Sequence, residues 1–229
     1  MFKAKLGAPP TIPVRIGSTV FRSMSKVSSS RGWRKCPSID SLPSELLEPL
    51  DMKDTGFHVP KDKRHRFASI YQSNANGTLR LRDPNESTHY RFPPRFFSGG
   101  GGLVSTARDY SHFVQMILNE GMLFGIRILS AESVRTMSRN HLSESADPIE
   151  LNGKRQGVGF GLGFAIRVEN SSWDSEARIG EFGWNGAAST HFWISPTNQL
   201  AVITLEQTQP YNWNLQSGLK GLIDDAIND

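Results

Sequence analysis

The chain has 229 residues, of which 37% are apolar and 21% charged, so it is long enough for one large or two small folded domains. No run approaches the roughly 18 apolar residues of a membrane helix, which argues against a membrane span. A single cysteine, Cys36, excludes a disulfide framework, and no Cys/His cluster has the spacing of a zinc site. We therefore expect a cytoplasmic protein with neither metal nor cofactor.

The net charge of +4 is unevenly distributed. Residues 1–36 carry eight basic side chains and no acidic one, which leaves 18 basic against 22 acidic side chains in the rest of the chain. A basic face for nucleic acid is therefore not expected on the body. The sequence predicts a basic, Ser/Pro-rich segment over residues 1–45 and a folded domain over residues 46–229. The basic segment could contain a functional motif, which is described below. It also resembles an organelle transit peptide, and a disordered, solvated tail is a further alternative.

Two helices are predicted in the middle of the chain, after loops and short elements over residues 51–98. Thr106 and Asp109 form a capping box, and the apolar residues behind them recur at helical spacing, which predicts a helix that ends near residues 119–121. In this reading Asp109 is explained by capping and needs no catalytic role. A second, short helix is expected to begin at Ser130.

The last third of the chain changes to a period of two. Apolar residues alternate with small ones over residues 160–168, which predicts one strand. Three further strands follow, and a turn at residues 196–198 separates the last two of them. A closing helix is expected to place apolar residues between Leu215 and Ile227 against the sheet. The three further strands are expected near residues 178–184, 187–194 and 199–206. The fold class is therefore α+β, with an antiparallel sheet flanked by helices.

Residue types and spacing alone indicate few candidate catalytic or ligand-binding residues. Ser23 and Lys26 have the Ser-x-x-Lys spacing, which on a helix places the lysine amine one turn from the serine hydroxyl, where it could act as a base. The glycine run 99–102 is read as a permissive turn rather than a phosphate site. The histidines are scattered without metal-ligand spacing, and of these His191 lies on a predicted strand that could face a cleft.

Three segments resemble serine β-lactamase-related hydrolases, the group that includes class C β-lactamases, penicillin-binding-protein-like proteins and family VIII carboxylesterases. They follow one another in the order of that family and cover most of residues 46–229. The segments are Leu47-Glu-Pro-Leu-Asp-Met-Lys-Asp-Thr-Gly-Phe57, Gly99-Gly-Gly-Gly-Leu-Val-Ser-Thr-Ala-Arg-Asp109, and Gly183-Trp-Asn-Gly-Ala-Ala188 with Thr190-His-Phe-Trp-Ile-Ser-Pro196.

The resemblance implies an acyl-enzyme mechanism. Phe21-Arg-Ser-Met-Ser-Lys26 is similar to the family's nucleophile motif, so Ser23 would attack the carbonyl and Lys26 would act as base. The backbone N–H groups of Ser23 and Ala187 would form the oxyanion hole. Trp184-Asn-Gly186 stands where β-lactamases have Lys-Thr-Gly, so these three residues would border the substrate. Without that lysine's cation, a neutral acyl ester is expected rather than a carboxylate-bearing antibiotic.

The chain also departs from the family pattern. Only about twenty residues lie between Lys26 and Leu46, where the family has most of a helical lobe and a catalytic tyrosine. The alternative to an active esterase is therefore a catalytically impaired, truncated member that binds a ligand or a partner. Loss of the lobe would expose apolar surface, through which the chain could self-associate.

Overall fold

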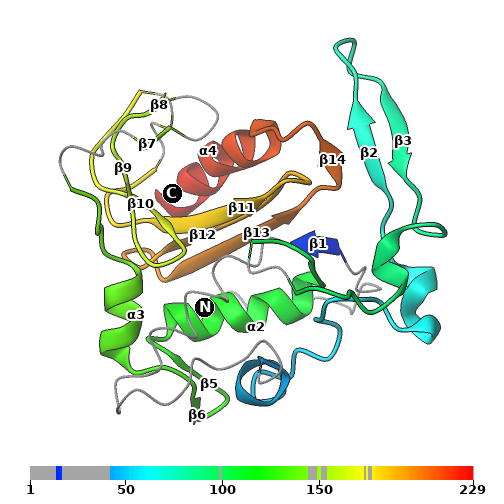
Figure 1. Ribbon diagram of the computed structural model, residues 1–229. Coiled ribbons are helices and arrows are strands. Elements are labelled where there is room, and N and C mark those ends of the chain that lie inside the picture. Colours follow the sequence, from blue (N-terminus) through cyan, green and yellow to red (C-terminus); the bar gives the residue numbers. More distant parts are fainter. Residues whose placement is uncertain are drawn as a thin grey trace.

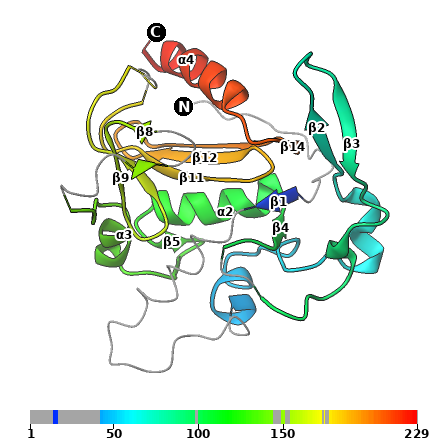
Figure 2. The same cartoon turned by 45° about the horizontal axis from the view of Figure 1, so that its top comes forward.

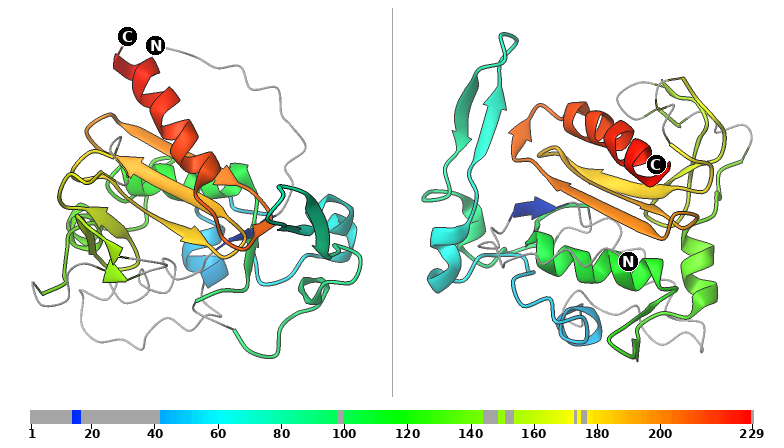
Figure 3. Two further views of the ribbon diagram at one scale, coloured as in Figure 1. Left: turned by 90° about the horizontal axis from the view of Figure 1, so that it is seen from above. Right: turned by 180° about the vertical axis from the view of Figure 1, so that it is seen from behind.

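A five-stranded antiparallel sheet lies at the centre of the computed structural model, which describes residues 14–16, 42–97, 100–143, 149–150, 154–172, 174 and 177–228. The strand order is β13-β12-β11-β10-β9. Helix α2 covers one face of the sheet and α4 the other (Figures 1 and 3). The strands are β9 (Val158–Phe160), β10 (Ala165–Arg167), β11 (Phe182–Gly186), β12 (Thr190–Ser195) and β13 (Leu200–Leu205). The α+β class predicted from the sequence is confirmed.

Helix α2 (Ala107–Leu118) forms as its spacing predicts. The Thr106 side chain accepts a hydrogen bond from the Asp109 N–H, which satisfies one of the free donors at the helix start. Phe113 and its apolar neighbours on the same face are buried in the core. Figure 2 shows α2 lying along one face of the sheet from another side. After a small hairpin, β5 (Met122–Leu123) and β6 (Ile126–Arg127), the short helix α3 (Ala131–Met137) starts at the predicted cap, Ser130.

The single strand predicted over residues 160–168 is wrong. The chain turns back within this stretch, so that Phe160 on β9 pairs with Ala165 on β10. Gly163 has a φ of +94°, and a Cβ on Gly161 would lie 2.0 Å from the Met137 carbonyl oxygen. The glycines that looked like the small face of one strand are therefore required by a tight turn and by a close approach of backbone.

Helix α4 (Asn214–Asn228) forms where expected but presents a different face to the sheet. Leu215, Leu222 and Ile227 are exposed, whereas Gln216 and Lys220 are buried. Lys220 Nζ lies 3.0 Å from Glu181 Oε2 and 3.2 Å from Asp174 Oδ2. Leu219 and Ile223 are half-buried. Acidic partners beneath the helix thus place Lys220 on the buried face, and the prediction of a buried apolar face is wrong for Leu215, Leu222 and Ile227.

The region over residues 51–98, predicted as loops and short elements, also contains a hairpin that projects from the body (Figures 1 and 2). Its strands β2 (Ile70–Ser73) and β3 (Leu79–Asp83) form a small sheet with β14 (Thr208–Gln209). The Asn76-Gly77 dipeptide at its tip is a strong hairpin signal that the sequence reading missed.

The remaining elements are short. A π-helical turn (Pro43–Leu47) contributes Leu46 and Leu47 to the core, and two 3-10 helices (Lys61–Arg66 and His89–Arg91) precede and follow the hairpin in the chain. The other strands are β1 (Val14–Ile16), which pairs with β4 (Leu103–Ser105), and β7 (Ile149–Glu150), which pairs with β8 (Lys154–Arg155). Among the described helices, none combines the length and the apolar character needed to cross a membrane. The proposed boundary at residue 45 stays a prediction.

Candidate functional site

The end of β11 is an open strand edge within the described residues. On one side, β10 pairs only with Phe182 and Gly183, so β11 continues through Trp184 to Gly186 beyond its last β10 partner. On the other side, the whole strand is held by β12. Ala187 follows directly and is exposed. The segment that the resemblance implicates therefore presents backbone groups at an edge that a substrate could approach.

The side chains of this segment do not converge on one place. Trp184 lies opposite Phe192 in the register, and its ring packs edge-on against Phe160 at 5.1 Å. Asn185 lies opposite His191, which belongs to the other face of the sheet. Alternation along the strand thus separates two of the three predicted substrate-binding residues, and what they share is the strand edge.

Ser23 and Lys26 lie outside the described residues. The nearest described segment before them is β1, which contacts β11 and pairs with β4. Ile16, the last residue of β1, pairs with Leu103 and precedes Ser23 by seven residues. Strand β1 therefore lies beside β11, the strand that immediately precedes the predicted oxyanion donor, Ala187.

His191 has a packing role. Its Nε2 donates to the Asn212 carbonyl oxygen at 3.1 Å, and its Nδ1 lies 3.2 Å from the Tyr211 hydroxyl. The ring also packs against Trp213 and is buried. Aromatic side chains that follow β14 cover the ring, so the structure gives His191 a structural role.

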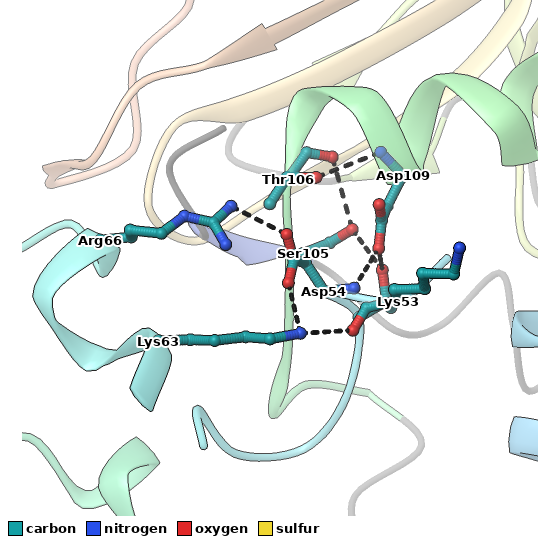
Figure 4. Close-up of polar contacts among 8 residues, drawn as sticks. Lys53, Asp54, Lys63, Arg66, Ser105, Thr106 and Asp109 are labelled. Atoms are coloured by element: carbon teal, nitrogen blue, oxygen red, sulfur yellow. Dashed lines mark hydrogen bonds and ion pairs between the residues drawn. The ribbon is translucent and has the colours of Figure 1, made fainter. Parts of the chain in front are cut away.

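A polar cluster joins the start of α2 to the segment 53–55 (Figure 4). Asp109 Oδ2 accepts hydrogen bonds from the Asp54 N–H at 2.7 Å and from Thr55 Oγ1 at 2.9 Å, and Thr55 Oγ1 lies 2.7 Å from Ser105 Oγ. The predicted capping box is therefore only half formed. Thr106 caps the helix, but the Asp109 carboxylate binds a segment 55 residues earlier in the chain.

Two basic side chains complete the cluster. Asp54 forms ion pairs with Lys63 at 2.6 Å and Arg66 at 2.8 Å, both from the 3-10 helix Lys61–Arg66. Lys63 also donates to the Lys53 carbonyl oxygen at 3.0 Å. These contacts tie the segment 53–55 to the 3-10 helix Lys61–Arg66.

The pKa values of the two carboxyl groups in the cluster, Asp109 and Asp54, are shifted in opposite directions. Burial raises the pKa of Asp109 above its ordinary value of 3.8, and the hydrogen bonds from Asp54 and Thr55 only partly offset this. Burial acts in the same sense on Asp54, but Arg66 and Lys63 together bring the pKa of Asp54 below 3.8. The cluster is thus a structural clamp in which Asp54 is the carboxylate held in its charged form.

The pH dependence of stability follows from these directions. Because the folded-state pKa of Asp54 is lowered, its contribution to stability is present above pH 3.8 and is lost as the pH falls through the folded-state value. We expect Asp54→Asn to weaken the loss of stability between about pH 5 and about pH 2 in urea unfolding. Asp109→Asn should instead remove a loss of stability that develops as the pH rises above 3.8, because the folded-state pKa of Asp109 is raised. Equal slopes for wild type and Asp54→Asn would contradict the assignment.

A cavity of about 640 Å³ lies beside the cluster. Its walls are mainly apolar and come from residues 42–60, Lys63, residues 93–97 and Val104, and not from Trp184–Ala187. A much smaller space beneath the β11 edge, about 10 Å³, is lined by Tyr110, Trp184 and Gly186 among others. In the part of the chain that the structure describes, no group of His, Cys, Asp or Glu side chains could hold a metal ion.

Comparisons with known proteins identify the same relationship. The family model described as Beta-lactamase matches residues 37–222. Protein Rv1367c of Mycobacterium tuberculosis is 35% identical over 179 residues, which cover 76% of this chain and 44% of the relative. The chain therefore spans less than half the length of the curated relative that it matches.

Solved structures share the fold. A mutant of simvastatin synthase (LovD) from Aspergillus terreus superposes with a TM-score of 0.68 at 22% identity, covering 82% of this chain and 50% of that one. EstCE1, described as a hydrolase with promiscuous acyltransferase activity, gives a TM-score of 0.61 at 20% identity over 83% and 50% of the two chains. The chain belongs to the Beta-lactamase family, with the β-lactamase/transpeptidase fold.

Proposed function

We propose that the chain is a serine hydrolase that cleaves small neutral acyl esters through an acyl-enzyme on Ser23. The observation that carries this proposal is the open edge of β11, which continues past its last β10 partner and ends at the exposed Ala187. A backbone N–H at this place is suited to donate a hydrogen bond to a developing oxyanion, because β12 already holds the rest of the strand in position.

Each residue of the proposed mechanism has a defined role. The Lys26 amine takes the proton of the Ser23 hydroxyl as Oγ attacks the ester carbonyl. The N–H groups of Ser23 and Ala187 stabilise the oxyanion of the tetrahedral intermediate. Lys26 then gives this proton to the departing alcohol, which leaves the acyl group on Ser23 Oγ. A water molecule attacks the acyl carbon while the Lys26 amine takes its proton, and the amine returns that proton to Ser23 Oγ as the carboxylic acid departs.

The charges around β11 favour a neutral substrate. Trp184 carries no cation where a substrate carboxylate would need one. The buried cations on the α4 side of the sheet are already engaged, since Lys220 binds Glu181 and Asp174, and Arg167 binds Asp174 at 2.9 Å. A carboxylate-bearing substrate would therefore gain little beside this strand.

Tyr110 does not replace the family's catalytic tyrosine. It lies beneath the β11 edge, but its side chain is buried and packs against Phe192 at 5.3 Å. Burial raises the pKa of Tyr110 far above its usual range, so the phenol keeps its proton. Lys26 is accordingly proposed to act in both proton-transfer steps.

The test is hydrolysis of p-nitrophenyl acetate by the purified chain, together with Ser23→Ala and the matched variant Ser25→Ala. We expect Ser23→Ala to abolish turnover and labelling by a fluorophosphonate probe, and Ser25→Ala to retain both. Folding of all three proteins is checked by circular dichroism. Equal turnover in Ser23→Ala and wild type, or no turnover in a folded wild type, would overturn the proposal. Either result would favour the alternative, an impaired member of the family that binds a ligand or a partner.

A further inference from the structure

The hairpin formed by β2 and β3 stands apart from the central sheet (Figures 1 and 3). In its small sheet the strand order is β14-β2-β3, so β3 is an outer strand and its free side faces away from β14. All residues of β3 except Asp83 are exposed. Within the described part of the chain, this strand therefore offers an open edge of five residues.

Hydrogen bonding fixes which backbone groups face that edge. The Tyr71 N–H donates to the Gln207 carbonyl oxygen at 2.8 Å, on the β14 side and away from β3. Tyr71 lies opposite Leu81, so these two residues form a pair without mutual backbone hydrogen bonds. The N–H and C=O of Leu81 must then point outward, and those of Leu79, two residues earlier, point the same way.

The side chains of the hairpin separate into two faces. Tyr71, Leu79 and Leu81 share one face and are 41%, 59% and 48% exposed. Arg80, which pairs with Gln72, lies on the opposite face, and Arg82 lies where the register shifts between the Ile70–Asp83 and Tyr71–Leu81 pairs; both arginines are exposed. Contiguous exposed apolar side chains are typical of an interaction surface.

We propose that the outer edge of β3 binds an extended segment of a partner protein in which acidic and apolar residues alternate. The backbone of that segment would pair with the outward groups of Leu79 and Leu81. Its apolar residues would extend the face of Tyr71, and its carboxylates would lie beside Arg80 and Arg82.

Arg80 and Arg82 also disfavour the pairing of β3 with the β3 strand of a second copy of this chain. An antiparallel pairing of two β3 strands centred on Leu81 is the register that overlaps all five residues, and it places Arg80 opposite Arg82 twice. A parallel in-register pairing brings equivalent arginines side by side. Like charges in these positions are destabilising, and charged residues on edge strands commonly block such self-pairing. An acidic strand would not be repelled by these arginines.

The proposal can be tested with two fluorescein-labelled heptapeptides, one alternating valine with glutamate and the other alternating valine with lysine. Fluorescence anisotropy with the full chain should show saturable binding of the glutamate peptide, at least about tenfold tighter than that of the lysine peptide. The double variant Arg80→Glu/Arg82→Glu should reverse this preference. The control Arg108→Glu/Arg139→Glu makes the same change in net charge at exposed sites elsewhere and should leave the preference unchanged.

Backbone pairing is tested separately from charge. Methylation of the peptide nitrogens that face β3 should abolish binding, whereas methylation of the alternate nitrogens should preserve it. Absence of saturable binding, equal loss in the control variant, or indifference to the position of methylation would each overturn the proposal. A dimer of the wild-type chain in sedimentation equilibrium that the glutamate peptide cannot dissociate and Arg80→Glu/Arg82→Glu abolishes would also overturn it. None of these readouts depends on ester hydrolysis.

Discussion

Lys220→Ala is expected to destabilise the folded chain by about 3–5 kcal/mol, the range for removing one partner of a buried ion pair. Lys220 is 7% exposed, and its Nζ bridges Glu181 Oε2 and Asp174 Oδ2 at 3.0 and 3.2 Å. Asp174 would keep Arg167 as a partner, but Glu181 would lose its buried cation. Urea unfolding at neutral pH measures the change, with tryptophan fluorescence as the signal because the Lys220 amine lies 5.5 Å from the Trp193 ring centre.

The double variant Lys220→Met/Glu181→Gln separates charge from packing. It removes both members of the closest pair and keeps their approximate volume, so most of the lost stability should return. Lys220→Met alone should remain destabilised, because Glu181 stays charged and buried. A loss below about 1 kcal/mol for Lys220→Ala would be typical of a surface ion pair and would contradict the role assigned to this network.

Gly183→Ala is expected to lower the free energy of unfolding by about 3 kcal/mol, at the upper end of the usual overpacking range. A Cβ on Gly183 would lie 2.0 Å from the Phe192 carbonyl oxygen and 2.9 Å from the Trp193 Cα, both on the neighbouring strand β12. Because these atoms are backbone, the two strands must separate. The same movement would displace Trp184–Gly186, so ester turnover should fall together with thermal stability.

Gly221→Ala is the matched control. A Cβ at this position on α4 meets no heavy atom within 4 Å, so alanine should stabilise the helix by about 0.5–1 kcal/mol through its higher helix propensity. Opposite signs for the two substitutions in thermal unfolding would show that close packing of β11 and β12, and not glycine chemistry in general, determines the result. Equal changes in thermal stability for Gly183→Ala and Gly221→Ala would contradict this explanation.

The sequence identifies candidate catalytic segments, but it does not show how their residues are arranged in space. The β11 segment was placed on a strand by its resemblance to the family, and its open edge was not visible until the register of β10 was known. The clamp of Asp54, Thr55, Ser105 and Asp109 lay within the recognised segments, but its contacts join residues 50 or more positions apart. Periodicity and spacing carry no information on such contacts.

The sequence by itself determined the features that depend on neighbouring residues. Helix α2 follows from its cap and its apolar repeat, and α3 from the cap at Ser130, because both are set within a few turns of backbone. The last two strands follow from alternation around a turn at residues 196–198. The tertiary structure decided the rest. It folded residues 158–167 into two strands joined by a turn, in which Gly163 has a positive φ and Gly161 lies against the Met137 carbonyl, a contact that the local sequence does not reveal. It also buried Lys220 rather than Leu215 and Leu222 of α4, because the acidic side chains that stabilise that lysine come from distant parts of the chain.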